Sequence, residues 1–255
     1  MRRVLCTMGG ERYDDTTAQT IAACFTMGVE VLVYDDRWLM THDFAKVNRW
    51  LFDHPGDKNG KRGLGWYAWK PLIILDALSR LSDGDVLVYL DADTVPVADF
   101  SVLYDVAARD GAMFFKSQTH KQTTWCTGDC YAVMGQEPDA TLDAGCARFL
   151  AVQRGPWVVA QLLMEWISYA VNPRATTFDP SRLAPEPPGF EEHRTEQAIL
   201  TNLCHKHGFK LYRECDESGE ESPDDRDGPD GYPQLFQQIR QGSCVNGPGS
   251  RFRNV

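Results

Sequence analysis

The feature that most constrains this fold is an apolar run that ends in two acids, D-V-L-V-Y-L-D-A-D at residues 85–93. A helix is predicted just before it, because Pro71 suits the first turn of a helix and leucines recur at 72, 75, 78 and 81. Ser82-Asp83-Gly84 then makes a tight turn. A helix, a short turn and an apolar strand in this order are typical of an α/β protein with a mostly parallel central sheet.

Other segments extend this plan along the chain. Further strands are predicted at 2–8, 29–34, 112–116, 130–134, 146–150 and 209–212, and helices at 15–27, 155–170 and 196–207. In the first helix we expect one apolar stripe to face the core, made of Ala18, Ile21, Ala22 and Phe25. The chain has no internal repeat and no linker that separates domains, so we expect a single domain with helices flanking the sheet.

Length and composition indicate a soluble globular protein, because the 255 residues are 43% hydrophobic and 24% charged. No apolar stretch is long enough to span a membrane. The N-terminus reaches Gly9-Gly10-Glu11 too soon for a signal peptide. We therefore expect a cytoplasmic protein whose eight cysteines are reduced.

Most of the formal charge of −10 lies in one segment. Residues 214–230 contain nine acidic residues and one basic residue, which gives that segment a charge of −8. Since it contains almost nothing apolar, a solvated loop or lid is predicted there. We assign 1–213 to the main body of the domain, and 214–255 to an acidic loop and C-terminal tail of the same domain that act as a lid.

Asp91 and Asp93 are the first candidates for chemistry. They follow the apolar strand at 85–90, and in α/β sheets ligands bind at the carboxyl ends of strands. Two carboxylates two positions apart in an extended chain project to the same side. Such a pair suits a hard divalent cation, Mg²⁺ or Mn²⁺, which prefers oxygen ligands and shares them with phosphates.

A second candidate segment, G-L-G-W-Y-A-W-K-P at 63–71, leads into the helix before that strand. A helix N-terminus presents free N–H groups to an anion, and Lys70 adds a full positive charge. This combination favours a phosphate-bearing ligand. The alternative for Trp66 and Trp69 is that they are core residues.

Together these segments resemble a family of nucleotide-sugar transferases with the GT-A fold, which has an aromatic segment ending in W-K-P followed by a D-x-D metal motif. The similarity continues in the same order with D-C-Y-A-V-M-G at 129–135, D-A-G-C-A-R-F at 143–149, F-E-E-H-R-T-E-Q at 190–197 and L-Y-R at 211–213. It covers residues 2–213, and five such segments in one order are far more specific than any one of them.

The resemblance implies a glycosyltransferase, of the hexosyltransferase class, that moves a sugar from a nucleoside-diphosphate sugar, such as a UDP-sugar, with Mn²⁺ or Mg²⁺. The similarity is greatest to enzymes that retain the anomeric configuration. Asp91 and Asp93 would hold the metal, and the implied catalytic residues are Glu196, Gln197 and Asp143. The implied donor-binding residues are Thr7, Gly9, Tyr13, Asp35, Trp66, Trp69, Lys70, Asp91, Ala92, Ala144, Gly145, His193 and Arg194.

This chain departs from the family pattern at three points. Asp143 stands where the family has Asn, and Glu196 stands where it has Asp. Many relatives supply a further metal ligand from a late histidine, whereas the last histidine here is His207, so the third protein ligand stays open. Glu196 has the alternative of an ordinary acid at a helix start, and His193 that of a hydrogen-bonded loop residue.

Other functions remain open on the sequence alone. Asp91-Ala92-Asp93-Thr94-Val95 also fits the haloacid-dehalogenase-type phosphatases, in which the first Asp is the nucleophile. A nucleotidyltransferase is a second alternative, and a lectin-like or scaffold module that binds the donor without turnover is a third. The acceptor is unidentified: a glycan, a small glycoside, a protein or modified DNA.

Overall fold

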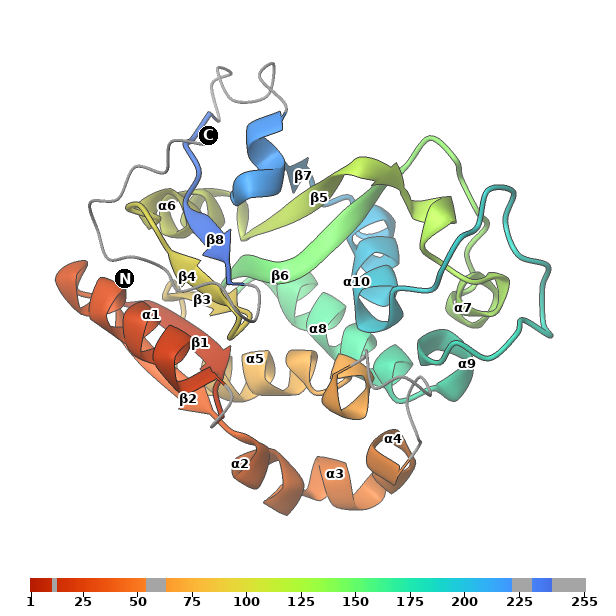
Figure 1. The fold of residues 1–255 in the computed structure, drawn as a ribbon, viewed down its shortest axis with the longest axis horizontal. Helices are drawn as coiled ribbons and strands as arrows, with labels where there is room; N and C mark the ends of the chain where they lie inside the picture. Colours follow the sequence, from red (N-terminus) through yellow and green to blue (C-terminus); the bar gives the residue numbers. More distant parts are fainter. Residues whose placement is uncertain (11–12, 54–62, 222–230, 240–255) are drawn as a thin grey trace, which may run out of the picture.

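The computed structural model describes residues 1–10, 13–53, 63–221 and 231–239. A mixed six-stranded sheet lies at the centre of this part of the chain (Figure 1). The strand order is β2 (Glu30–Tyr34), β1 (Arg3–Met8), β3 (Val86–Leu90), β6 (Asp143–Gln153), β5 (Ala112–Lys121) and β7 (Leu211–Tyr212). β6 is antiparallel to both of its neighbours, and the other neighbouring pairs are parallel. The predicted α/β fold with a mostly parallel sheet is confirmed.

Two cores form because side chains alternate between the faces of each strand. On one face, Val4 and Cys6 of β1 belong to a core with α5 (Lys70–Ser79), α8 (Trp157–Ala170) and α10 (Thr195–Lys206). On the other face, Leu5 belongs to a core with α1 (Asp14–Thr26) and α6 (Ser101–Asp110). The sheet is therefore buried on both sides, which explains the continuous apolar run of β3.

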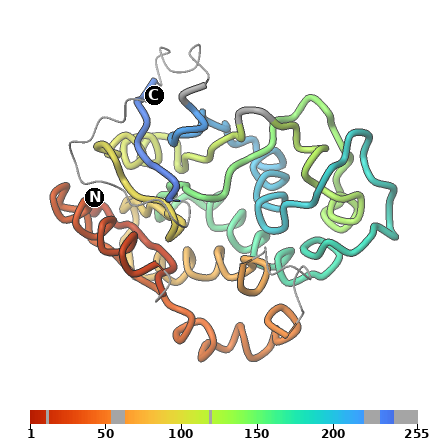
Figure 2. Tube along the Cα trace, viewed as in Figure 1, coloured from red at the N-terminus to blue at the C-terminus, as the bar shows by residue number. Residues whose placement is uncertain are grey.

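Shorter elements connect these layers. The remaining helices are α2 (Asp36–Thr41), α3 (Asp43–Val47), α4 (Arg49–Asp53), α7 (Gly128–Met134) and α9 (Pro173–Thr176), with 3₁₀ turns η2 (Leu64–Tyr67), η3 (Gln122–Thr124) and η4 (Glu217–Glu221). A separate two-stranded ribbon pairs β4 (Thr94–Pro96) with β8 (Phe236–Gln238). Figure 2 shows the blue segment that contains β8 running beside β4, so the end of the described chain returns to the residues that follow β3. None of the helices in the described part of the chain has the length and apolar character of a membrane span.

One predicted strand, at 130–134, is wrong, because these residues lie in α7. The Oγ1 atom of Thr127 accepts a hydrogen bond from the backbone N–H of Cys130, which caps the helix N-terminus. Gly135 ends the helix with a left-handed φ of 64°. A short apolar run fits strand or helix equally well, and here the two caps decide it.

The predicted apolar stripe of α1 faces the wrong way. Ile21 is 43% exposed and Phe25 is 85% exposed. The buried side of the helix carries Thr16, Thr20 and Cys24 instead. Since Thr16 Oγ1 donates a hydrogen bond of 2.5 Å to the backbone oxygen of Ala92, this side of α1 packs on the chain that follows β3.

The start of the acidic segment also differs from the predicted solvated loop. Glu214 and Asp216 are buried, and their carboxylates lie 2.9 and 2.8 Å from the guanidinium of Arg148. Pairing with a cation offsets part of the cost of removing a carboxylate from solvent. Residues 222–230, which carry the rest of the predicted loop, and residues 240–255 lie outside the described residues.

Candidate active site

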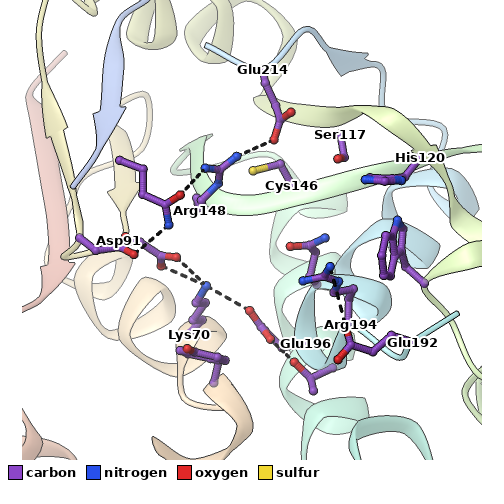
Figure 3. A pocket seen from close by; sticks show the side chains of 16 residues that line it. Lys70, Asp91, Ser117, His120, Cys146, Arg148, Glu192, Arg194, Glu196 and Glu214 are labelled. Carbon is purple, nitrogen blue, oxygen red and sulfur yellow. Dashed lines mark hydrogen bonds and ion pairs between the residues drawn. The ribbon is translucent and has the colours of Figure 1, made fainter. Parts of the chain in front are cut away.

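A cavity of about 660 Å³ opens at the carboxyl end of β3. Asp91 and Asp93 line it together with residues of β5, β6, α10, the segment before α10, and β8 (Figure 3). The fold brings six of the residues that the sequence predicted for the site to this cavity: Lys70, Asp91, Asp93, Arg194, Glu196 and Gln197.

Lys70 is the electrostatic centre of this cavity. Its Nζ atom lies 3.0 Å from Asp91 Oδ1 and 3.0 Å from Glu196 Oε1, and its side chain is only 4% exposed. Burial by itself would lower the pKa of Lys70, but the two carboxylates outweigh burial and raise it above its usual value. Lys70 therefore carries its charge at neutral pH and joins the strand end to α10.

Asp91 is held on several sides. Tyr89 donates its hydroxyl to Asp91 Oδ1, and the backbone N–H of Asp91 donates to the oxygen of Arg148 at 2.7 Å. Burial raises the pKa of Asp91 above its usual value, with Lys70 opposing this shift and Asp93 adding to it. Asp91 is thus a fixed carboxylate whose position follows from β3 and β6.

The glycine-rich segment before α5 positions the lysine through backbone conformation. Gly65, Trp66 and Tyr67 all have left-handed φ angles, of 57°, 56° and 58°. A side chain at Gly63 would lie 2.2 Å from the Tyr67 ring, so that ring requires glycine there. The turn places the Tyr67 ring 5.0 Å from Lys70 Nζ, a cation–π distance.

Glu196 reaches the cavity from a strained helix start. Thr195 has a φ of 47°, which is an uncommon conformation for a β-branched residue. Its hydroxyl donates to Glu196 Oε2 at 2.5 Å, and Trp166 Nε1 donates to the backbone oxygen of Glu196 at 3.0 Å. The Glu196 carboxylate is therefore held by both Thr195 and Lys70. An ordinary acid at a helix start does not need such partners.

Asp93 has a different set of partners. Thr94 Oγ1 donates to its Oδ1 at 3.1 Å, and Gln238 Nε2 donates to its Oδ2 at 3.0 Å. Both donors are neutral, so within the described part of the chain the charge of Asp93 is not paired with a cation. Sequence reasoning missed Gln238 and Arg148, because no local pattern indicates that Gln238, 145 positions away, contacts Asp93 or that Arg148 contacts Gln238.

These carboxylates fit a divalent cation unequally. On Asp91, Lys70 contacts both oxygens and Tyr89 takes a further position on Oδ1. On Asp93, each oxygen accepts one hydrogen bond and keeps a second acceptor position. Among the described residues no group of three or more His, Cys, Asp or Glu side chains is placed to hold a metal ion. Of the two carboxylates, Asp93 is therefore the one with acceptor positions left for a further partner.

Other predicted residues near this site have structural partners. Asp143 does not line the cavity, and its Oδ1 accepts a hydrogen bond of 2.6 Å from Lys121. Ala144 is buried, and a side chain at Gly145 would lie 2.6 Å from Thr201 Oγ1 of α10. His193 accepts a hydrogen bond from the backbone N–H of Thr127 at Nδ1, and its Nε2 lies 2.9 Å from the backbone oxygen of Ala175. Both ring nitrogens therefore have backbone partners, which agrees with the alternative that His193 is a hydrogen-bonded loop residue.

The predicted residues of the first two strands lie at the same edge of the sheet. Thr7 is near the end of β1, and Asp35 follows β2. Since β1 is parallel to both β2 and β3, the carboxyl ends of all three strands lie at the same edge of the sheet. Asp35 caps α2 by accepting a hydrogen bond of 2.6 Å from the backbone of Trp38. Gly9 donates to the backbone oxygen of Tyr34 at 2.7 Å. Tyr13 precedes α1.

Both tryptophans of the glycine-rich segment are core residues. The Trp66 ring packs edge-on against Phe178 with ring centres 4.8 Å apart. Trp69 is buried, and its Nε1 donates to the backbone oxygen of Leu64 at 2.9 Å. Ala92 lies between the two acids, where its backbone oxygen accepts the hydrogen bond from Thr16.

Comparisons with known proteins find similarity at the level of structure. No protein-family model matches the sequence, and no curated protein matches it. Among solved structures, the bifunctional glycosyltransferase WbbM has a TM-score of 0.47 at 12% identity, over 79% of this chain and 37% of that chain. The galactosyltransferase LgtC, in complex with donor and acceptor sugar analogues, has a TM-score of 0.48 at 12% identity, over 92% and 86%. Mouse xyloside xylosyltransferase 1 has 0.43 at 11%, over 96% and 99%. All three of these proteins are glycosyltransferases.

Proposed function

We propose that this protein is a glycosyltransferase that moves a sugar from a nucleoside-diphosphate sugar, such as a UDP-sugar, to a hydroxyl acceptor. One observation carries this proposal: a pair of carboxylates at the end of β3 faces a cavity of about 660 Å³ together with a fixed acid, Glu196, at the start of α10. The charge of a diphosphate leaving group must be neutralised, and sugar transfer needs a carboxylate or amide placed near the reacting carbon.

Asp93 and Asp91 would hold a Mn²⁺ or Mg²⁺ ion, with Asp93 as the main protein ligand. Bound there, the cation neutralises the charge of the diphosphate leaving group. The proposed role of Lys70 is to hold Asp91 and Glu196, because its Nζ atom lies 3.0 Å from each carboxylate. Its charge is thus paired within the protein rather than directed at the donor. This keeps the two carboxylates in place when the cavity fills.

Glu196 and Gln197 are the proposed catalytic residues. Both line the cavity at the start of α10, where they would face the reacting carbon of the sugar or the acceptor hydroxyl. We do not assign this part to Asp143, because it is paired with Lys121 outside the cavity lining. Retention of the anomeric configuration is the outcome we propose from the family resemblance, and the anomeric signal of the product in an NMR spectrum tests it.

A thermal-shift screen of nucleotide sugars with and without Mn²⁺ tests the proposal. At a ligand concentration of about 100 times Kd, a bound donor stabilises by roughly 2.7 kcal/mol, which raises Tm by about 5–10 °C for a chain of this size. We expect one donor to do this only with the metal, and Asp93→Asn to remove the shift. Asp83→Asn, an exposed acid on the turn before β3, is the matched control and keeps the shift.

Three outcomes would contradict the proposal. A metal-dependent Tm shift that survives in Asp93→Asn would remove the basis of the assignment. Release of phosphate from an aryl phosphate, lost in Asp91→Asn, would indicate a phosphatase instead. Tight UDP binding with neither hydrolysis nor transfer to any glycan, glycoside, protein or DNA acceptor would indicate a binding module.

A further inference from the structure

Gln238 bridges two charged groups that lie far apart in the sequence. Its Nε2 donates to Asp93 Oδ2 at 3.0 Å, and its Oε1 accepts a hydrogen bond from Arg148 Nη1 at 3.3 Å. All three side chains line the cavity (Figure 3). A single amide thus connects the acid at the end of β3 with the cation on β6.

Strand β8 holds this amide in register. Gln238 is the partner of Thr94 in the antiparallel ribbon of β4 and β8. The backbone N–H of Ile239 donates to the backbone oxygen of Asp93 at 2.6 Å, and that of Gln238 donates to Glu217 Oε2 at 3.2 Å. The main chain directly after β8 therefore binds Asp93, which keeps the neighbouring Gln238 beside it.

Arg148 fixes which end of the amide faces Asp93. A guanidinium has only donors, so the amide oxygen of Gln238 must face Arg148 and its NH₂ group must face Asp93. Arg148 itself is held by Glu214 at 2.9 Å and Asp216 at 2.8 Å, and both acids are buried. The two acids thus hold Arg148 in place, and its donor-only guanidinium sets the direction of the hydrogen bonds to Gln238 and on to Asp93.

We propose that Gln238 is a positioning residue that orients the Asp93 carboxylate for cation binding, an inference that rests on the function proposed above. With Thr94 donating to Oδ1 and Gln238 to Oδ2, the carboxylate plane is fixed and one acceptor position on each oxygen stays open. Groups that orient a ligating carboxylate in this way typically contribute 10–100-fold to metal affinity.

The test is Mn²⁺ binding by isothermal titration calorimetry in the presence of saturating UDP. Gln238→Met keeps the length of the side chain but cannot donate to Asp93, and we expect its Kd for Mn²⁺ to rise at least about tenfold. Gln238→Asn keeps the amide but is too short to bridge both partners, and a similar rise is expected. Gln237→Met is the matched control, because neighbouring residues of a strand project to opposite sides.

Transfer assays at varied Mn²⁺ separate positioning from a structural role. We expect Gln238→Met to reach at least half of the wild-type kcat at saturating Mn²⁺ while needing about tenfold more of the metal. An unchanged Kd in both Gln238 variants, equal to that of Gln237→Met, would overturn the inference. If Asp93→Asn in addition kept wild-type Mn²⁺ binding, the proposed function itself would fail, which distinguishes the two cases.

Discussion

Lys70 carries a full charge in a place that solvent hardly reaches, so its two carboxylate partners must be present for the folded state to tolerate it. The reverse also holds, because without the lysine the buried Glu196 and the partly buried Asp91 would be two acids with no cation between them. We predict that Lys70→Met lowers the free energy of unfolding at pH 7 by about 3–5 kcal/mol, measured by urea denaturation.

A surface ion pair supplies the control for this prediction. Lys206 lies 2.7 Å from Glu165, but its side chain is 37% exposed, so Lys206→Met is expected to change stability by only about 0–1 kcal/mol. Adding Glu196→Gln to Lys70→Met should recover part of the loss, since one of the two unpaired charges is removed. Equal losses for Lys70→Met and Lys206→Met would show that the buried pair does not stabilise the fold.

At this scale the sequence predicted the residues that local motifs carry. Asp91 and Asp93 follow a recognisable strand, and Lys70 opens a recognisable helix, so their meeting in one cavity was foreseeable. Gln238 and Arg148 were not, because the hydrogen bond between them joins positions 90 residues apart and depends on which strand pairs with β4. Side-chain networks of this kind follow from topology rather than from spacing in the chain.

Among the elements, α1 shows why an apolar stripe can mislead. Its buried side is chosen by two threonines that donate to backbone oxygens, Thr16 to Ala92 and Thr20 to Thr94, rather than by apolar content. Those oxygens belong to the segment that carries the two acids. Helix α1 therefore supports the site through polar contacts, and its apolar side is left in solvent.

This orientation yields a prediction for Phe25, which is 85% exposed. Phe25→Ala should change the free energy of unfolding by no more than about 0.5 kcal/mol, because surface substitutions have little effect. Phe100→Ala, at a fully buried position of the core on which α1 packs, should lower it by about 3–5 kcal/mol. Urea denaturation of both variants checks this, and a loss at Phe25 close to that at Phe100 would mean that α1 packs by its apolar side after all.

For the molecule as a whole, the start of the acidic segment, at Glu214 and Asp216, is tied to the centre of the sheet rather than kept apart from it. Glu214 and Asp216 approach Arg148 of β6 from one side, and Gln238 approaches it from the other. Composition indicated a solvated loop because it counts charges without their partners. One arginine on a central strand is enough to bury two of those acids.

That burial makes the contribution of Asp216 to stability depend on pH. Burial raises the pKa of Asp216 to about 6, against the attraction of Arg148, whereas its ordinary value is 3.8. Between these values the folded chain holds a proton that the unfolded chain has lost, so the contribution of Asp216 to stability falls as pH rises from about 4 to 6.

Asp216→Asn cannot titrate, and its stability relative to wild type should therefore increase across this range. Urea denaturation of both proteins at several pH values measures the difference. A relative stability of Asp216→Asn that stays constant or decreases between pH 4 and 6 would show that Asp216 ionises in the folded protein as readily as in the unfolded chain, and that its pairing with Arg148 fully offsets its burial.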